Sequence, residues 1–192
     1  EVKSRVWKSH AVFYSQYGMD SHIDSLNEQG GLAQRGRFYL ERQNLFDAAH
    51  RANTHGWGQE AVHLALAALL ITDLQGPAGA AVPICRRALR HDVSPNLRAH
   101  ALRMLGQEYR KIGQYQEAEV LLEQALELCI QHELVESQGY VHTHLGNVFL
   151  RRGGAEKALE QYELGLGCYR KVGQRRAEGI ALGNLGVLHL GQ

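Results

Sequence analysis

The chain has 192 residues, of which 44% are hydrophobic and 21% charged, and its formal net charge at pH 7 is +1. This composition predicts an ordinary globular protein of one or two domains. A charge near zero gives no bulk attraction to nucleic acid or to a membrane surface. The longest mostly apolar run, residues 61–71, is too short to span a bilayer. The chain begins without Met and stops just after the first helix of a repeat, so we expect both ends to be cuts in a longer protein.

Residues 1–56 are predicted to form an irregular helical part. A helix is expected over residues 2–17, with a broad apolar and aromatic face made by Val6, Trp7, His10, Phe13, Tyr14 and Tyr17. A short helix carrying Ile23 and Leu26 should follow, and Gly30-Gly31 should break the chain. A third helix is expected over residues 37–53, with an inner side made by Leu40, Asn44, Leu45, Ala48, Ala49 and Ala52.

Residues 57–192 are predicted to form an array of repeats, of which residues 59–90 are a degenerate first member. Residues 59–74 are rich in Ala and Leu on nearly every face, which predicts a buried helix. Ala81, Cys85 and Ala88 follow at the spacing that recurs in the second helix of the next unit. Pro83 conflicts with this interpretation, because proline inside a helix kinks it or delays its start.

The remaining chain repeats itself every forty residues. Leu105-Gly106 returns as Leu145-Gly146 and again as Leu185-Gly186, which predicts units over residues 97–133 and 134–173 and a partial unit over 174–192. In each unit two runs of helical periodicity are joined by a Gly-containing turn, which indicates an antiparallel helix pair. Gly106 and Ala118 are expected where the two helices cross, because only small residues allow close approach. Stacked pairs predict an all-α fold, a right-handed solenoid.

The repeated residues resemble a tetratricopeptide repeat. The first unit matches at Leu105-Gly106, Tyr109, Gly113, Tyr115, Ala118, Leu122 and Ala125. The second matches at Leu145-Gly146, Phe149, Gly153, Ala158 and Tyr162, with Gly165 where Ala is usual, and the third begins with Leu182, Leu185-Gly186 and His189. The period of forty exceeds the usual roughly thirty-four residues. The longer form resembles the repeats of kinesin light chains and of bacterial signalling NTPases.

A second resemblance covers the front of the chain. The stretch from Tyr39 to Ala49, with Glu41, Asn44-Leu45 and Ala48, is similar to the segment between the winged helix and the tetratricopeptide units of STAND-class signalling NTPases. The chain itself contains no phosphate-binding GxxxxGK[ST] motif, so the NTPase would lie outside it.

No motif for catalysis or metal binding stands out. The eleven histidines include no HExxH motif and no pair at helical spacing four. The three cysteines, Cys85, Cys129 and Cys168, lie tens of residues apart, which favours packing roles in a reducing, cytoplasmic setting over disulfides or zinc. Paired arginines such as Arg151-Arg152 fall near helix ends, where cations are stabilised by the helix dipole, so nucleic-acid binding is disfavoured. We expect no catalytic residue, metal or cofactor.

The resemblance implies that the first helix of each pair lines a concave surface. In the first regular unit this surface would carry His100, Arg103, Gln107 and Arg110, a polar and partly cationic stripe. The matching residues are Tyr140, Thr143, Asn147 and Arg151 in the second unit and Asn184 in the third. Arg103 and Arg110 favour a peptide of acidic character. His144 and Ile180 stand where chaperone adaptors place the Asn and Lys of their carboxylate clamp, which disfavours chaperone-tail binding.

The sequence therefore predicts a non-catalytic recognition module for a protein, peptide or other ligand. We expect it to act in the cytoplasm as the sensor or regulatory arm of a larger signalling or transcription-regulating protein, without a membrane partner. A free-standing scaffold or self-assembling adaptor is the first alternative, with a homodimer formed through the apolar cut end at Ile180, Val187 and Leu190. A metal-dependent enzyme using the histidine-rich helices is the second alternative.

Overall fold

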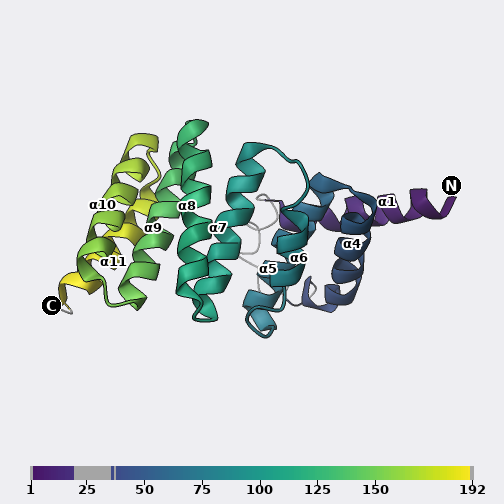
Figure 1. Cartoon of the computed structure of the whole chain (residues 1–192), viewed down its shortest axis with the longest axis horizontal. Helices are drawn as coiled ribbons and strands as arrows, with labels where there is room; N and C mark the ends of the chain where they lie inside the picture. Colours follow the sequence, from purple (N-terminus) through teal and green to yellow (C-terminus); the bar gives the residue numbers. More distant parts are fainter. Residues whose placement is uncertain (1, 20–35, 37, 191–192) are drawn as a thin grey trace. The chain divides into compact units, whose positions relative to one another are not determined.

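The computed structural model describes residues 2–19, 36 and 38–190, and Figure 1 shows its helices. The described residues form helices and connecting turns, with no strand among them, as the all-α prediction requires. The chain divides into two compact units, Glu1–Ser94 and Pro95–Gln192. The predicted helix around Ile23 and Leu26 and the break at Gly30-Gly31 lie outside the described residues.

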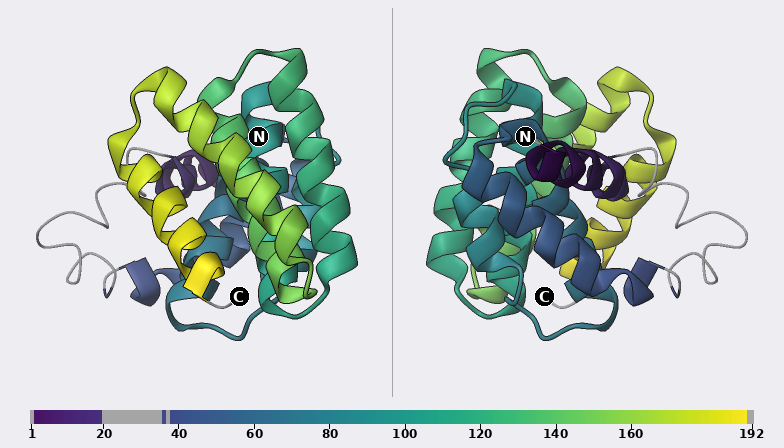
Figure 2. Two further views of the ribbon diagram at one scale, coloured as in Figure 1. Left: turned by 90° about the vertical axis from the view of Figure 1, so that its left-hand side faces the viewer. Right: turned by 90° about the vertical axis from the view of Figure 1, so that its right-hand side faces the viewer.

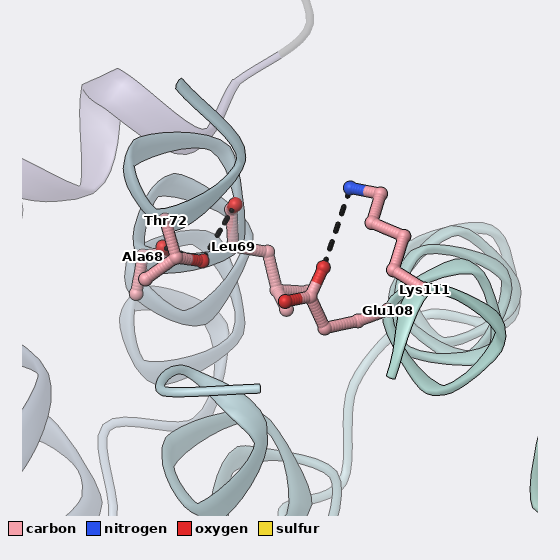
Figure 3. A network of polar contacts seen from close by, with 5 residues as sticks. All are labelled: Ala68, Leu69, Thr72, Glu108 and Lys111. Carbon is pink, nitrogen blue, oxygen red and sulfur yellow. Dashed lines mark hydrogen bonds and ion pairs between the residues drawn. The ribbon is translucent and has the colours of Figure 1, made fainter. Parts of the chain in front are cut away.

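The first unit contains α1 (Val2–Ser15), the short 3-10 helix η1 (Gln16–Gly18), α4 (Arg42–His55), α5 (Gly58–Gln75) and α6 (Val82–Ala88). Helix α5 contacts α1, η1, α4 and α6 and forms the centre of this unit. Its buried residues lie all round the helix, as predicted, and include every position from Leu64 to Leu69. The one buried hydroxyl on α5 is satisfied locally, because Thr72 Oγ1 lies 3.0 Å from the carbonyl oxygen of Ala68 and 2.9 Å from that of Leu69 (Figure 3).

Two predicted faces in the first unit are partly wrong. On α1, Ala11 and Tyr14 are buried, but Val6 and Phe13 are 60% and 55% exposed. Phe13 is one residue from Tyr14, and one residue rotates the side chain by about 100° around a helix, so the expected face was too broad to pack entirely. Before α4, Leu40 is 81% exposed instead of internal.

The predicted inner side of α4 is correct at four positions, since Leu45, Ala48, Ala49 and Ala52 are buried. Asn44 is instead exposed, and its side-chain amide donates to the Glu41 carboxylate at 2.8 Å. The same carboxylate accepts a 2.6 Å hydrogen bond from the Tyr14 hydroxyl, which joins α1 to the start of α4. The inner side of α4 is therefore made of Leu45 and small residues.

The conflict at Pro83 is resolved by a delayed helix start. Helix α6 begins at Val82 and places Pro83 in its first turn, where the missing N–H has no intrahelical partner to lose. Cys85 and Ala88, the predicted inner residues, are buried. The predicted boundary at residue 56 falls between α4 and α5 inside the first unit, and the assignment of residues 59–90 as a degenerate repeat stays a prediction.

The second unit contains α7 (Pro95–Lys111), α8 (Tyr115–Gln131), α9 (Val135–Arg151), α10 (Ala155–Val172) and α11 (Arg175–Leu190). Helices α7 and α8 form one antiparallel pair and α9 and α10 the next, and α11 packs on α10 (Figures 1 and 2). Gly113 and Gly153 turn the chain within the pairs at a φ of +80°, a conformation that favours glycine. The predicted bounds of the repeats, residues 97–133, 134–173 and 174–192, stay a prediction.

The glycines at the helix crossings make equivalent contacts in the two complete pairs. A Cβ on Gly106 would lie 2.9 Å from Cγ of Leu122, and a Cβ on Gly146 would lie 2.5 Å from Cε1 of Tyr162. The same position on α11, Gly186, has no described atom within 4 Å of a built Cβ. Gly106 and Gly146 are therefore equivalent contact points between first and second helices, whereas the equivalent point on α11 is open among the described residues.

No helix in the described part of the chain is both long enough and apolar enough to cross a membrane.

Candidate partner-binding face

The candidate site lies on the first helices of the second unit. We call the predicted residues the first-helix stripe: His100, Arg103, Gln107, Arg110, Tyr140, Thr143, Asn147, Arg151 and Asn184. Helix α7 contacts α9 directly, so the members on these two helices lie on neighbouring elements. Helix α11 carries only Asn184, which is half-buried.

Arg103 connects the two helices of the stripe. Its guanidinium carbon lies 5.3 Å from the centre of the Tyr140 ring, within the range of a cation–π contact. Its Nη1 lies 3.2 Å from Nε2 of His144. An arginine side chain held by both an aromatic ring and a hydrogen bond loses less conformational freedom on binding an anion.

The contact with Arg103 determines the protonation state of His144. A guanidinium nitrogen can only donate, so His144 Nε2 accepts and the imidazole proton lies on Nδ1. Some of the residue reaches solvent, but Nδ1 itself is buried. Burial, followed by the charges of Arg103, Arg110 and Lys111, lowers the pKa of His144 to about 3. His144 is therefore a neutral hydrogen-bond donor at physiological pH.

Two buried donors near this contact have no hydrogen-bond partner among the described residues. They are Nε of Arg110, one residue before the end of α7, and Nδ1 of His144 on α9. Leaving a buried donor unsatisfied costs about 1–3 kcal/mol, and more when the group is charged. The surroundings are cationic, since Arg103, Arg110 and Lys111 all act electrostatically on His144.

Lys111 has an acidic partner on its own helix. Its Nζ lies 3.3 Å from the buried carboxylate of Glu108 (Figure 3). The positive charge of Lys111 is thus partly neutralised within α7.

Tyr140 and Thr143 are tied to the second helix of their own pair. The Tyr140 ring makes an edge contact with Tyr169 on α10, with the ring centres 5.4 Å apart. The Thr143 hydroxyl lies 3.1 Å from the Tyr169 hydroxyl and donates to the carbonyl of Gly139 at 3.0 Å. Thr143 is only 7% exposed, so its prediction as a surface contact is wrong. A threonine in a helix returns its hydroxyl to the preceding turn, and here it also reaches α10.

The other members of the stripe differ in exposure. Asn147 is half-buried, and its side-chain oxygen accepts a 2.8 Å hydrogen bond from the Tyr162 hydroxyl, which leaves its amide protons as donors. His100 and Gln107 on α7 are half-buried, and Arg151 at the end of α9 is exposed. The structure therefore brings Arg103 and Tyr140 together with His144, a residue that the stripe did not include, and Arg110 acts on His144 through its charge.

His144 could have been found from the sequence by its spacing. It lies four residues after Tyr140, on the same face of α9. In the sequence it is notable only as a departure from the carboxylate clamp of chaperone adaptors, and its contact with Arg103, 41 positions away, follows only from the fold.

The second helix of the first pair, α8, carries the opposite charge. Glu117, Glu119, Glu123 and Glu127 lie on α8, and the carboxylate of Glu119 forms an ion pair with Arg152 at the end of α9. The cationic members of the stripe on α7 and the four glutamates on α8 thus lie on different helices of the pair.

Burial determines the chemistry of the three cysteines. Cys85, Cys129 and Cys168 are free and buried, as predicted. Burial raises the pKa of Cys85 to about 12 and that of Cys129 to about 11, so neither is a thiolate nucleophile at neutral pH. Within the described residues, no three potential metal ligands come together.

The structure is similar to several solved structures. A STAND protein with a tetratricopeptide repeat sensor from Pyrococcus horikoshii aligns with 94% of this chain at a TM-score of 0.72 and 12% identity. BtubC (BKLC) from P. vanneervenii aligns with 83% at a TM-score of 0.60 and 20% identity. A putative kinesin light chain with nearly identical repeats from Podospora anserina aligns with 82% at a TM-score of 0.50 and 16% identity.

The chain has a tetratricopeptide-type fold. The predicted all-α solenoid and the predicted resemblance to a STAND sensor region are both confirmed at the level of fold. This tetratricopeptide-type chain spans 64% of the length of BtubC, 27% of the STAND protein and 93% of the kinesin light chain structure. No family model and no curated protein matches the sequence.

Proposed function

We propose that the tetratricopeptide-type chain is a non-catalytic recognition module that binds a protein segment of acidic character on the first-helix stripe. The observation that carries this proposal is the cationic contact between α7 and α9, where Arg103 lies between Tyr140 and His144 and Arg110 keeps a buried N–H without a described acceptor. Charge-assisted hydrogen bonds from arginine to carboxylates are among the stronger polar contacts available to a protein.

The test is a titration of acidic peptides into the full chain and into Arg103→Glu/Arg110→Glu. Reversing both charges should weaken binding by at least about tenfold, because each replaces an attraction by a repulsion. The matched control is Arg175→Glu/Arg176→Glu, which makes the same change in net charge at two exposed positions in the first turn of α11. Equal affinity of the peptides for the wild type and the stripe variant would contradict the proposal. Equal weakening by both variants would also contradict it, because binding would then depend on net charge and not on Arg103 and Arg110.

We also propose that the module is the cytoplasmic sensor or regulatory arm of a larger signalling protein. The similarity in fold to a sensor-bearing STAND protein supports this role, as does the resemblance of residues 39–49 to the segment that precedes the repeats in such proteins. A Walker A motif followed by a winged helix in the same polypeptide would support the proposal, and a polypeptide that begins near Glu1 would favour the free-standing scaffold.

Self-association through α11 is a second candidate. Ile180, Val187 and Leu190 on this helix are 55%, 66% and 91% exposed, and contiguous exposed apolar side chains mark interaction surfaces. Sedimentation of the chain should show a dimer that Ile180→Glu/Val187→Glu converts to a monomer. A wild-type monomer at all concentrations would exclude this candidate.

A further inference from the structure

We infer that helix α1 of one copy of the chain docks on helix α8 of a second copy, in a weak, head-to-tail self-association. This inference goes beyond the proposed function, because it involves neither the first-helix stripe nor α11. The observation that carries it is that these two helices have opposite charge and that both expose apolar side chains.

The exposed face of α1 combines apolar side chains with positive charge. Val2, Val6 and Phe13 are 77%, 60% and 55% exposed, and their spacing of four and seven residues places them on one side of the helix. Lys3 and Arg5 are exposed on the same helix, whose sequence contains no acidic residue. Exposed apolar side chains in a row mark an interaction surface, and the two cations favour an acidic partner.

Helix α8 has the complementary composition, with four glutamates and neither lysine nor arginine. Glu123 and Glu127 are exposed. Val120 and Ile130 are 44% and 59% exposed and lie on the same side of the helix as these glutamates, at successive spacings of three, four and three residues. Helix α8 therefore offers negative charge and apolar side chains on one face.

The other described helices do not offer this combination. Helices α4, α7, α9, α10 and α11 each contain both acidic and basic residues. Helix α5 contains acidic residues and no lysine or arginine, but it is buried nearly all round. Charge complementarity therefore selects α8 as the partner of α1.

The contact is expected to be weak and sensitive to salt. Two single helices bury less surface than the roughly 1,200–2,000 Å² of a stable complex. Because α1 and α8 are different surfaces, each copy in a pair keeps one of them open, and association continues head to tail. Attraction between exposed charges is screened as the ionic strength rises.

The first experiment is sedimentation of the full chain carrying Ile180→Glu/Val187→Glu, which removes any association through α11. The chain should associate with increasing concentration at an ionic strength of about 0.01 M, where screening acts over roughly 30 Å, and should be monomeric at about 1 M, where it acts over roughly 3 Å. A monomer at both ionic strengths, or association that salt does not change, would overturn the inference.

Neutral variants of α1 locate one side of the contact. Lys3→Gln/Arg5→Gln should weaken association by about tenfold, through loss of two exposed charge interactions. Arg175→Gln/Arg176→Gln is the matched control, because it makes the same change in net charge at exposed positions of α11. Equal association of the two variants, with the melting temperature of the parent chain retained, would overturn the inference.

The other side of the contact is located in the same way on α8. Glu123→Gln/Glu127→Gln should also weaken association by about tenfold. Its control, Glu156→Gln/Glu160→Gln, changes two exposed glutamates of α10 and should stay within about twofold of the parent chain. A larger effect of the α10 variant would place the contact elsewhere and overturn the inference.

Mixing the two neutral variants gives the decisive measurement. Lys3→Gln/Arg5→Gln retains an intact α8, and Glu123→Gln/Glu127→Gln retains an intact α1. An equimolar mixture should therefore form a complex of one copy of each with the affinity of the parent chain, although neither variant associates strongly alone. A symmetric interface gives no such recovery, and a mixture that stays monomeric would overturn the inference.

A last variant separates this inference from the proposed function. Arg103→Glu/Arg110→Glu should leave the self-association within about twofold, because the first-helix stripe does not take part in it. If this variant abolished association while Lys3→Gln/Arg5→Gln did not, the acidic face of α8 would bind the stripe. That result would support the proposed function and overturn docking on α1.

Discussion

At the scale of single residues, His144 gives the sharpest consequence for stability. Its folded-state pKa of about 3 lies below the ordinary value of about 6.5, so between these values the unfolded chain binds more protons than the folded chain. Stability contributed by neutral His144 is therefore complete above about pH 6.5 and is lost as the pH falls toward 3. His144→Gln keeps a neutral amide that can accept from Arg103 and should remove this dependence.

The expected effect is that the free energy of unfolding falls less in His144→Gln than in the wild type between pH 7 and pH 4.5. The difference should be on the order of 1–2 kcal/mol, after a reduction for the partial solvent access of the residue. Urea unfolding at several pH values measures it. His132→Gln, at an exposed position, is the control and should follow the wild type. Parallel curves for all three proteins would contradict a neutral, buried His144.

The repeated glycines allow a matched comparison within one chain. Gly146→Ala should destabilise the fold by about 1–3 kcal/mol, because its Cβ would meet the Tyr162 ring at 2.5 Å. Gly186→Ala, at the same position of the repeat, should stabilise the 192-residue chain by about 0.5–1 kcal/mol, because the helix gains alanine in open space. Thermal unfolding of both variants measures the two effects. Changes in stability of the same sign would show that packing does not distinguish the two positions.

The role of an individual residue can be predicted from the sequence where a single contact within the repeat determines it. The small side chains at Gly106 and Gly146 followed from the need for close helix approach. Thr143 was misplaced because the repeat register gives its position on the helix but not the reach of its hydroxyl to Tyr169 on α10. The role of His144 depends on Arg103 of another helix, and no local pattern contains such a contact.

At the scale of helices, periodicity predicted α7 to α11 well because each of them presents one buried face to a partner. It failed on α1, where aromatic residues extend around more than one face.

Val6 and Phe13 should therefore be dispensable for stability, and Val6→Gln/Phe13→Gln should change the melting temperature little, since both side chains are already exposed. Tyr14→Ala should lower stability by about 3 kcal/mol, through loss of a buried ring and of the hydrogen bond to Glu41. Equal destabilisation by the two variants would instead support the broad packing face that the sequence predicts for α1.

At the scale of the whole molecule, the two units raise the question of which part folds alone. The second unit holds its own core, in clusters such as Leu166, Tyr169, Ala177 and Ala181, with Tyr140 and Leu185 packed against them. In repeat proteins stability is close to a sum over repeats and their nearest-neighbour contacts, so a block of adjacent repeats retains most of its own stability. We therefore expect a polypeptide of residues 95–192 to fold without residues 1–94.

The test of independent folding compares the fragment with the full chain. Circular dichroism of residues 95–192 should show a helical protein with one cooperative thermal transition, because the hairpins α7–α8 and α9–α10 stay intact. Amide resonances of α9 and α10 should overlay those of the full chain, since their contacts with one another are retained. A fragment with poorly dispersed resonances and no cooperative transition would contradict the expectation. It would also mean that the repeats, although periodic in sequence, require the first unit to hold their arrangement.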